Sequence, residues 1–252
     1  MAARRGIFVA PFGELAEPGV VAELAARAED RGWDGFFLWD HVAFHDPERA
    51  IADPWVTLAA MAVATRRLVL GPLVTPVPRR RPHKLARETV SLDRLSGGRL
   101  VLGVGLGWHR SGEFDENRYG EEPDPRARAR LLDDGLDRLL AYWGGEFEPR
   151  PVQRPRIPIW VACDWPHRRP VRRAARFDGL FPSDLPGPEA LADLAGEIAA
   201  LRGSTDGFDL VVTNSPRTDP APWAAAGATW CLTGLGSRAR ASRVEKAIDE
   251  AL

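Results

Sequence analysis

The 252-residue chain has few cysteines, no long apolar run and almost no net charge. Its two cysteines, Cys163 and Cys231, are too few for a disulfide framework, which is typical of a reducing compartment. No stretch of about 18 apolar residues is present, so the sequence predicts no membrane-spanning helix. The formal net charge of -1 gives no overall positive field to attract nucleic acid or anionic lipid.

The N-terminal segment MAARRGIFVAPFG also lacks something, namely the apolar stretch of roughly 7–15 residues that a signal peptide requires. Together these absences favour a cytoplasmic protein that acts on a small-molecule substrate. We expect neither a nucleic acid nor a membrane as its partner.

Apolar runs and helical patterns alternate along the whole chain. Strands are expected at 7–11, 35–40, 67–76, 99–107, 157–163, 179–184, 208–214 and 228–234. Helices are expected at 18–31, from 53 onward, and at 83–98, 126–145, 168–177, 188–202, 220–226 and 238–251. This alternation predicts a single α/β domain over residues 1–252, a compact (β/α)8 TIM-type barrel. An open doubly wound sheet is the alternative, but it would suit fewer strands and a nucleotide fingerprint after the first one.

The second strand ends in an acid and an imidazole, Asp40 and His41, within 36-FFLWDHVAFHD-46. Catalytic groups of such barrels come from the C-terminal ends of strands, and histidine changes charge near neutral pH. The pair is therefore a candidate catalytic site. The alternative is that Asp40 caps a turn and His41 is an ordinary rim residue.

The third strand carries Gly71-Pro72 inside an apolar run. Proline cannot donate to a strand ladder, so the strand is expected to bulge or kink there, either beside an active site or at a plain barrel corner. Thr75 follows with a hydroxyl that suits a ligand. The run of arginines at 79–81 is either a solvated loop or a partner for phosphates or carboxylates.

The fourth strand runs into 103-GVGLGWHRSGEF-114. Its alternate glycines allow a backbone to approach something flat or anionic. This is not the dinucleotide fingerprint, because Trp108 occupies the position of the last glycine. The fifth strand ends in Cys163-Asp164, where the cysteine is interpreted as a small buried thiol rather than a nucleophile.

Several motifs in order resemble one family, the bacterial-luciferase-like monooxygenases and their relatives that use the deazaflavin F-420 (coenzyme F420). They are 29-EDRGWDGFFLWDH-41, the block from 53-DPWVTLAAM through DRLSGGRLVLGVGLGWHRSGEF-114, 151-PVQRPRIPIWVA-162 and 224-AAAGATWCLTGL-235. The resemblance covers nearly the whole chain. It implies a TIM-type barrel that binds FMN or F420 at the C-terminal face of the strands.

The resemblance also assigns residues. It implies that Asp40 and His41 lie near the reactive ring edge, and that a bulge with a non-proline cis peptide in the third strand backs the ring. The implied cofactor-binding residues are Gly71, Pro72, Leu73, Val74, Thr75, Gly107, Trp108, His109, Cys163 and Asp164. Cys163 and Asp164 stand where many members have a glycine-rich phosphate turn, so the sequence departs from the family at that turn.

The implied activity is hydride transfer or oxygenation of a small organic substrate, with F420 favoured over FMN and no metal. Two other hypotheses remain: a barrel that binds flavin weakly or serves only as a binding protein, and a metal-dependent hydrolase suggested by 40-DHVAFHD-46. The helix containing VTLAAMAVA is apolar on all sides, which predicts a homodimer interface.

Overall fold

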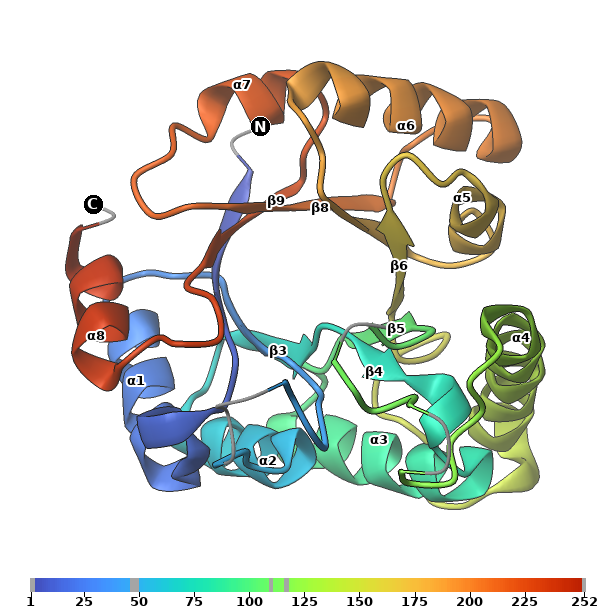
Figure 1. The fold of residues 1–252 in the computed structure, drawn as a ribbon, viewed down its shortest axis with the longest axis horizontal. Coiled ribbons are helices and arrows are strands. Elements are labelled where there is room, and N and C mark those ends of the chain that lie inside the picture. The colour runs from blue at the N-terminus through green and yellow to red at the C-terminus, as the bar shows by residue number, and fades with distance from the viewer. Residues whose placement is uncertain (1–2, 46–49, 109–110, 116–117, 251–252) are drawn as a thin grey trace.

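The strands form a ring surrounded by helices (Figure 1). The protein is represented by a computed structural model, which describes residues 3–45, 50–108, 111–115 and 118–250. The strands are β1 (Arg4–Val9), β2 (Gly35–Leu38), β3 (Val69–Pro72), β4 (Thr75–Pro76), β5 (Leu102–Gly105), β6 (Ile159–Asp164), β7 (Gly179–Ser183), β8 (Asp209–Asn214) and β9 (Trp230–Gly234). They pair in the order β3-β2-β1-β9-β8-β7-β6-β5-β4, and every pairing is parallel.

The third barrel position is shared by two short strands. β3 ends at Pro72 and β4 begins at Thr75, with a cis peptide bond between Leu73 and Val74 in the gap. The ring closes through a parallel bridge in which Leu70 accepts a hydrogen bond from Val101 at 2.9 Å and donates to the Arg99 carbonyl at 3.1 Å. The predicted TIM-type barrel is thereby confirmed.

Helices separate successive strands, except β3 from β4, and cover the outside of the ring (Figure 1). They are α1 (Pro18–Asp30), α2 (Pro54–Ala64), α3 (Pro82–Ser96), α4 (Pro125–Ala141), α5 (Arg169–Ala174), α6 (Pro188–Arg202), α7 (Ala221–Ala225) and α8 (Ala241–Glu250). Three short turns are also helical: η1 (Gly13–Ala16), η2 (Val77–Arg79) and the π-helical η3 (Tyr142–Glu146). No helix in these described ranges is long and apolar enough to cross a membrane.

Local sequence signals set several of the boundaries. Asp53 caps α2 by accepting hydrogen bonds from the backbone of Trp55 at 2.9 Å and Val56 at 3.0 Å. Several expected boundaries were wrong, and two of them have a clear cause. β1 begins at Arg4 rather than residue 7, because its arginines pair with β9 although their side chains are not apolar. The helix expected over 126–145 leaves α-geometry after Ala141, ahead of Gly144 and Gly145.

Side chains on the strands divide between two apolar cores. One lies between the strands and the helices, and the other fills the barrel lumen. In the lumen Phe37, Trp160 and Trp230 pack against one another with ring centroids 5.4–5.6 Å apart. All three are fully buried, so the lumen is a packed core at the N-terminal end of the strands.

The backbones of β3 and β5 approach unusually closely. A Cβ atom added at Gly71 would lie 1.9 Å from the Val101 carbonyl oxygen, and one added at Gly103 would lie 2.3 Å from the Pro72 carbonyl oxygen. Glycine is therefore required at both positions, Gly71 in β3 and Gly103 in β5. This contact fixes where Leu73 and Val74 enter the lumen.

The close approach predicts a large stability difference between two glycine substitutions. Gly71→Ala is expected to lower the free energy of unfolding by about 2 kcal/mol or more, because a rigid backbone carbonyl occupies the space. Gly196 on α6 has nothing within 4 Å of an added Cβ. Gly196→Ala is therefore expected to raise the free energy of unfolding by about 0.5–1 kcal/mol. Urea unfolding of the two variants measures both effects. Equal effects would contradict the steric argument.

Candidate active site

Asp40 lies just beyond the end of β2, with 2 % of its surface exposed. Its carboxylate accepts a hydrogen bond from Thr75 Oγ1 at 2.8 Å and is bound by Arg80 Nη2 at 2.9 and 3.0 Å. Arg79 Nη2 donates to the same carboxylate. Asp40 is therefore a buried ion-paired group rather than a free acid.

The two arginines come from a tight turn after the third barrel position. η2 (Val77–Arg79) follows Pro76 directly, and Arg80 N–H closes the turn on the Val77 carbonyl at 2.9 Å. Of the two interpretations of this run, binding to carboxylates holds for Arg79 and Arg80, whereas Arg81 is exposed.

Glu113 supplies a second buried carboxylate, from the loop after β5. Its side chain is 0 % exposed and accepts hydrogen bonds from Arg79 Nη1 at 2.7 Å and Ser111 Oγ at 3.1 Å. The backbone N–H groups of Val42 and Ala43 also donate to it. Glu113 thus links this loop to the segment that follows β2.

The pKa of Glu113 lies below its usual value. Burial is the largest single influence and would raise the pKa, but the hydrogen bond with His41, the charge of Arg79 and the Val42 N–H together outweigh it. The pKa of Glu121, on the same loop, is raised. Burial is the main cause and the charge of Glu113 also raises it, whereas the charges of Arg79 and Arg80 lower it.

The ring of His41 is oriented by Glu113. Its Nδ1 lies 3.1 Å from Glu113 Oε2. Because an ionised carboxylate can only accept, Nδ1 carries the proton of this hydrogen bond and Nε2 is left to exchange a proton with a ligand. The His41 side chain is 11 % exposed, so it lies at the edge of the buried cluster.

Aromatic rings form a wall beside His41. Its ring lies 5.2 Å from Phe44, 5.8 Å from Trp39 and 6.1 Å from Phe12, and Phe44 stacks on Trp108 at 5.6 Å. The buried Trp39 Nε1 has no hydrogen-bond partner within the described part of the chain. An unpaired buried donor is costly, and a ligand acceptor at that position would satisfy it.

The residues predicted in the third strand lie at or near this cluster. Leu73 and Val74 belong to the lumen core, and Thr75 binds Asp40. Gly71 and Pro72 form the close contact with β5. The strand thus presents apolar side chains to the lumen and a hydroxyl to Asp40.

The residues predicted after β5 are only partly described. Gly107 has φ +86, and an added Cβ would lie 2.2 Å from the Phe114 ring, so its conformation serves protein packing. The glycines of this strand were also expected to face something flat or anionic. Gly103 and Gly105 instead face the protein segment Pro72–Val74. Trp108 is 40 % exposed and contacts Phe44. His109 lies outside the described residues.

The Cys163 thiol belongs to the core between the strands and the helices, and burial, followed by the charge of Asp164, raises its pKa to about 12. Asp164 is exposed and accepts a hydrogen bond from Ser183 Oγ at 2.6 Å. Trp165 N–H and His167 N–H both donate within the protein, to Ser183 and Asp164 carbonyls. The turn after β6 therefore offers a phosphate few backbone donors.

Three charged members of the cluster were not named by the sequence analysis as site residues: Glu113, Arg79 and Arg80. Glu113 stands in the quoted motif 103-GVGLGWHRSGEF-114, where an acid two residues after Ser111 in a strand-end loop was a usable signal. In the ranges that the structure describes, no three His, Cys, Asp or Glu side chains gather to hold a metal ion.

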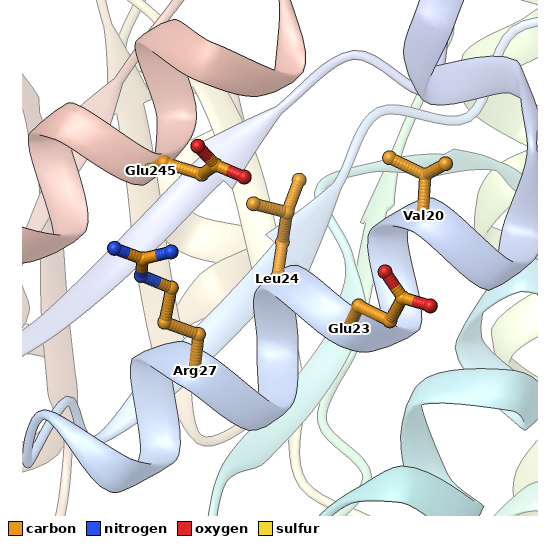
Figure 2. A pocket seen from close by; sticks show the side chains of 5 residues that line it. All are labelled: Val20, Glu23, Leu24, Arg27 and Glu245. Carbon is orange, nitrogen blue, oxygen red and sulfur yellow. The ribbon is translucent and has the colours of Figure 1, made fainter.

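Two surface hollows lie away from the cluster. The first, of about 260 Å3, lies between α1 and α8 and is lined by Val20, Glu23, Leu24, Arg27 and Glu245 (Figure 2). The second, of about 270 Å3, lies between α4 and α5 and is lined by Asp133, Arg169, Arg172, Arg173 and Arg176. Both are on the outer helices, so the buried cluster and not a hollow marks the candidate site.

Comparison with known proteins gives the family. The model of the luciferase-like monooxygenases matches residues 7–228. The chain belongs to the luciferase-like monooxygenase family. Named relatives of this family member include an F420-dependent glucose-6-phosphate dehydrogenase and a 4-hydroxyprotoasukamycin monooxygenase.

Two sequence relatives and one structure illustrate the range of this luciferase-like family. An uncharacterized protein of Mycobacterium tuberculosis is 29 % identical over 260 residues, covering 87 % of this chain and 89 % of its own. The F420-dependent glucose-6-phosphate dehydrogenase of Nakamurella multipartita is 34 % identical over 210 residues, covering 75 % of this chain and 58 % of its own. An F420-dependent secondary alcohol dehydrogenase in complex with an F420-acetone adduct has the same fold, with a TM-score of 0.79, 17 % identity and coverage of 99 % and 97 %.

The depressed pKa of Glu113 predicts how Glu113→Gln changes stability with pH. A lowered folded-state pKa contributes stability above the unfolded value of 4.5, and this is lost as pH falls through the folded value. Glu113→Gln is expected to cost about 2–4 kcal/mol at pH 7, since it removes one of the two buried carboxylates that Arg79 binds. The cost should shrink as the pH falls below 4.5 and through the lowered pKa of folded Glu113. Urea unfolding of both proteins across this range tests it, and a pH-independent difference would contradict it.

Proposed function

We propose that the protein is an F420-dependent oxidoreductase that interconverts a hydroxyl and a carbonyl group on a small organic substrate. The observation that carries the proposal is the pair formed by His41 and Glu113 at the end of the barrel where strands terminate. A histidine whose Nδ1 is fixed by a buried carboxylate presents Nε2 as a positioned acid and base. The pair stands beside the rings of Phe12, Trp39 and Phe44.

The residues at the top of the lumen suit a flat ring. Val74 and Trp39 are partly buried and pack on the lumen core. They offer an apolar platform, and the unpaired Trp39 Nε1 offers one donor to a ring heteroatom or substrate oxygen. Leu73, Val74, Thr75 and Trp108 are the residues that we assign to the coenzyme.

In this proposal His41 accepts and donates the proton of the reaction. When bound, the deazaflavin accepts or donates a hydride at its ring carbon. In alcohol oxidation, Nε2 of His41 takes the hydroxyl proton, and in carbonyl reduction it returns a proton to the oxygen. Glu113 stabilises the imidazolium that forms, as the orienting carboxylate does in other base–carboxylate pairs.

The names of similar proteins support F420 as the coenzyme, since a dehydrogenase relative and a structure of the same fold both carry it in their names. Against tight binding, the exposed Asp164 carboxylate would repel a coenzyme phosphate at the β6 turn. FMN-dependent oxygenation and a non-catalytic binding barrel are the competing outcomes of the test below.

Coenzyme titration and one variant test the proposal. The protein is expected to bind F420 with higher affinity than reduced FMN and to reduce F420 with a secondary alcohol. His41→Ala is expected to keep coenzyme binding and lower kcat by about 100-fold, the range for a lost general acid or base. Cys231→Ser serves as the control, because the Cys231 thiol lies in the core outside the lumen.

Three results would count against this function. Binding of reduced FMN with oxygen-dependent turnover would make the protein a monooxygenase. Binding of neither coenzyme would favour a non-catalytic barrel. Unchanged turnover in His41→Ala would remove His41 from the chemistry.

We also propose that the protein is a homodimer joined through α2. Val56 and Val63, one heptad apart on that helix, are 62 % and 65 % exposed. Light scattering at micromolar concentration is expected to give twice the 27.7 kDa chain mass, and Val56→Glu with Val63→Glu should shift the protein to monomer. A monomeric starting protein would contradict this.

A further inference from the structure

Arg79 touches both buried carboxylates of the site. Its Nη1 donates to Glu113 Oε1 at 2.7 Å, and its Nη2 donates to the Asp40 carboxylate. The same Nη2 lies 3.2 Å from the Asp40 carbonyl oxygen, which belongs to the peptide group that joins Asp40 to His41. One planar, rigid group therefore holds the main chain before His41 and the carboxylate bound to the His41 ring.

The other partners bind one carboxylate each. Thr75 and Arg80 contact Asp40 alone, whereas Ser111 and the Val42 and Ala43 N–H groups contact Glu113 alone. Across the described ranges, Arg79 is the single side chain that bridges the two. Losing it would remove the side-chain link between the Asp40 and Glu113 carboxylates beside His41.

Burial makes the charge of Arg79 effective at His41. The Arg79 side chain is 3 % exposed, and those of Asp40 and Glu113 are 0 % exposed, so solvent screens these charges weakly. With His41 neutral, the two carboxylates balance Arg79 and Arg80. A proton on His41 adds a positive charge close to Arg79.

The charged groups that the structure describes around His41 all enter this balance. Glu113 bonds its ring, Asp40 precedes it, Arg79 and Arg80 bind those carboxylates, and Glu121 interacts with Arg79, Arg80 and Glu113. Of these, the guanidinium of Arg79 is the cation in direct contact with the carboxylate that holds the ring.

We infer that Arg79 is a positioning residue that fixes the orientation of His41 and sets the pH at which His41 gains its proton. The inference rests on the proposed function in that His41 is the acid and base. Arg79 itself does not need to contact the substrate or the coenzyme.

Two substitutions separate the effect of the Arg79 charge from the effect of its side-chain geometry. Arg79→Gln removes a positive charge, which favours the imidazolium, so the midpoint of the His41 titration should rise by about one pH unit. Arg79→Lys keeps the charge on a single point that cannot bridge two carboxylates and a carbonyl. Its His41 midpoint should stay within about 0.3 unit of the unsubstituted protein, while kcat falls about 10-fold with KM little changed.

NMR of the histidine rings measures the titration in the full chain without substrate or coenzyme. The chain has five histidines, and the resonance lost in His41→Ala identifies His41. Arg81→Gln is the matched control, because Arg81 belongs to the same run but is exposed. We expect it to change neither the titration nor kcat. The pH dependence of kcat/KM should follow the NMR midpoint in each variant.

Several results would overturn the inference. An unchanged or lowered His41 midpoint in Arg79→Gln would exclude the charge role, and wild-type kcat in Arg79→Lys would exclude the geometric role. If Arg79→Gln fails to fold, as judged by circular dichroism, the kcat of Arg79→Lys decides alone. A shift equal to that of Arg81→Gln would mean a general charge effect and would also refute it.

Failure of the proposed function gives a different result. A protein that binds no coenzyme but shows the raised midpoint in Arg79→Gln would keep the electrostatic role of Arg79 and lose the assigned reaction. A protein that turns over normally with no shift in midpoint would keep the reaction and lose the role of Arg79.

Discussion

The ion pairs between Asp40, Glu113 and the two arginines of η2 hold the functional end of the barrel together. They join three segments that are far apart in sequence: the end of β2, the turn after β4 and the loop after β5. Charges this deeply buried are tolerated when each is matched by a partner and by hydrogen bonds, and here each carboxylate has several. The site therefore exists only when the barrel is closed.

The barrel beneath the cluster determines where the residues of the site lie. Gly71 and Gly103 allow β3 and β5 to approach until other residues would collide, and the chain between β3 and β4 then places Leu73 and Val74 over the lumen. Thr75 resumes the strand and reaches Asp40. Close packing of two backbones thus determines which side chains face a ligand and which support the acid.

Much of this arrangement was predictable from local patterns. Strands and helices follow apolar periodicity, Pro72 signals an interruption because it has no N–H to donate, and Asp40-His41 signals a polar strand end. Glu113 and Arg79 were not identified, because their importance depends on the path of a loop that brings residues 34 positions apart into contact. Sequence also left open whether the arginine run was solvated, since exposure is decided by the turn at Val77.

The N-terminal end of the lumen limits the route by which molecules can reach the site. Phe37, Trp160 and Trp230 block it, and the Arg4 guanidinium covers the Trp230 ring at 4.2 Å. Any two molecules that bind at the site together must both enter and leave at the C-terminal end of the strands. If one of them lies beneath the other, the lower one must bind first and leave last.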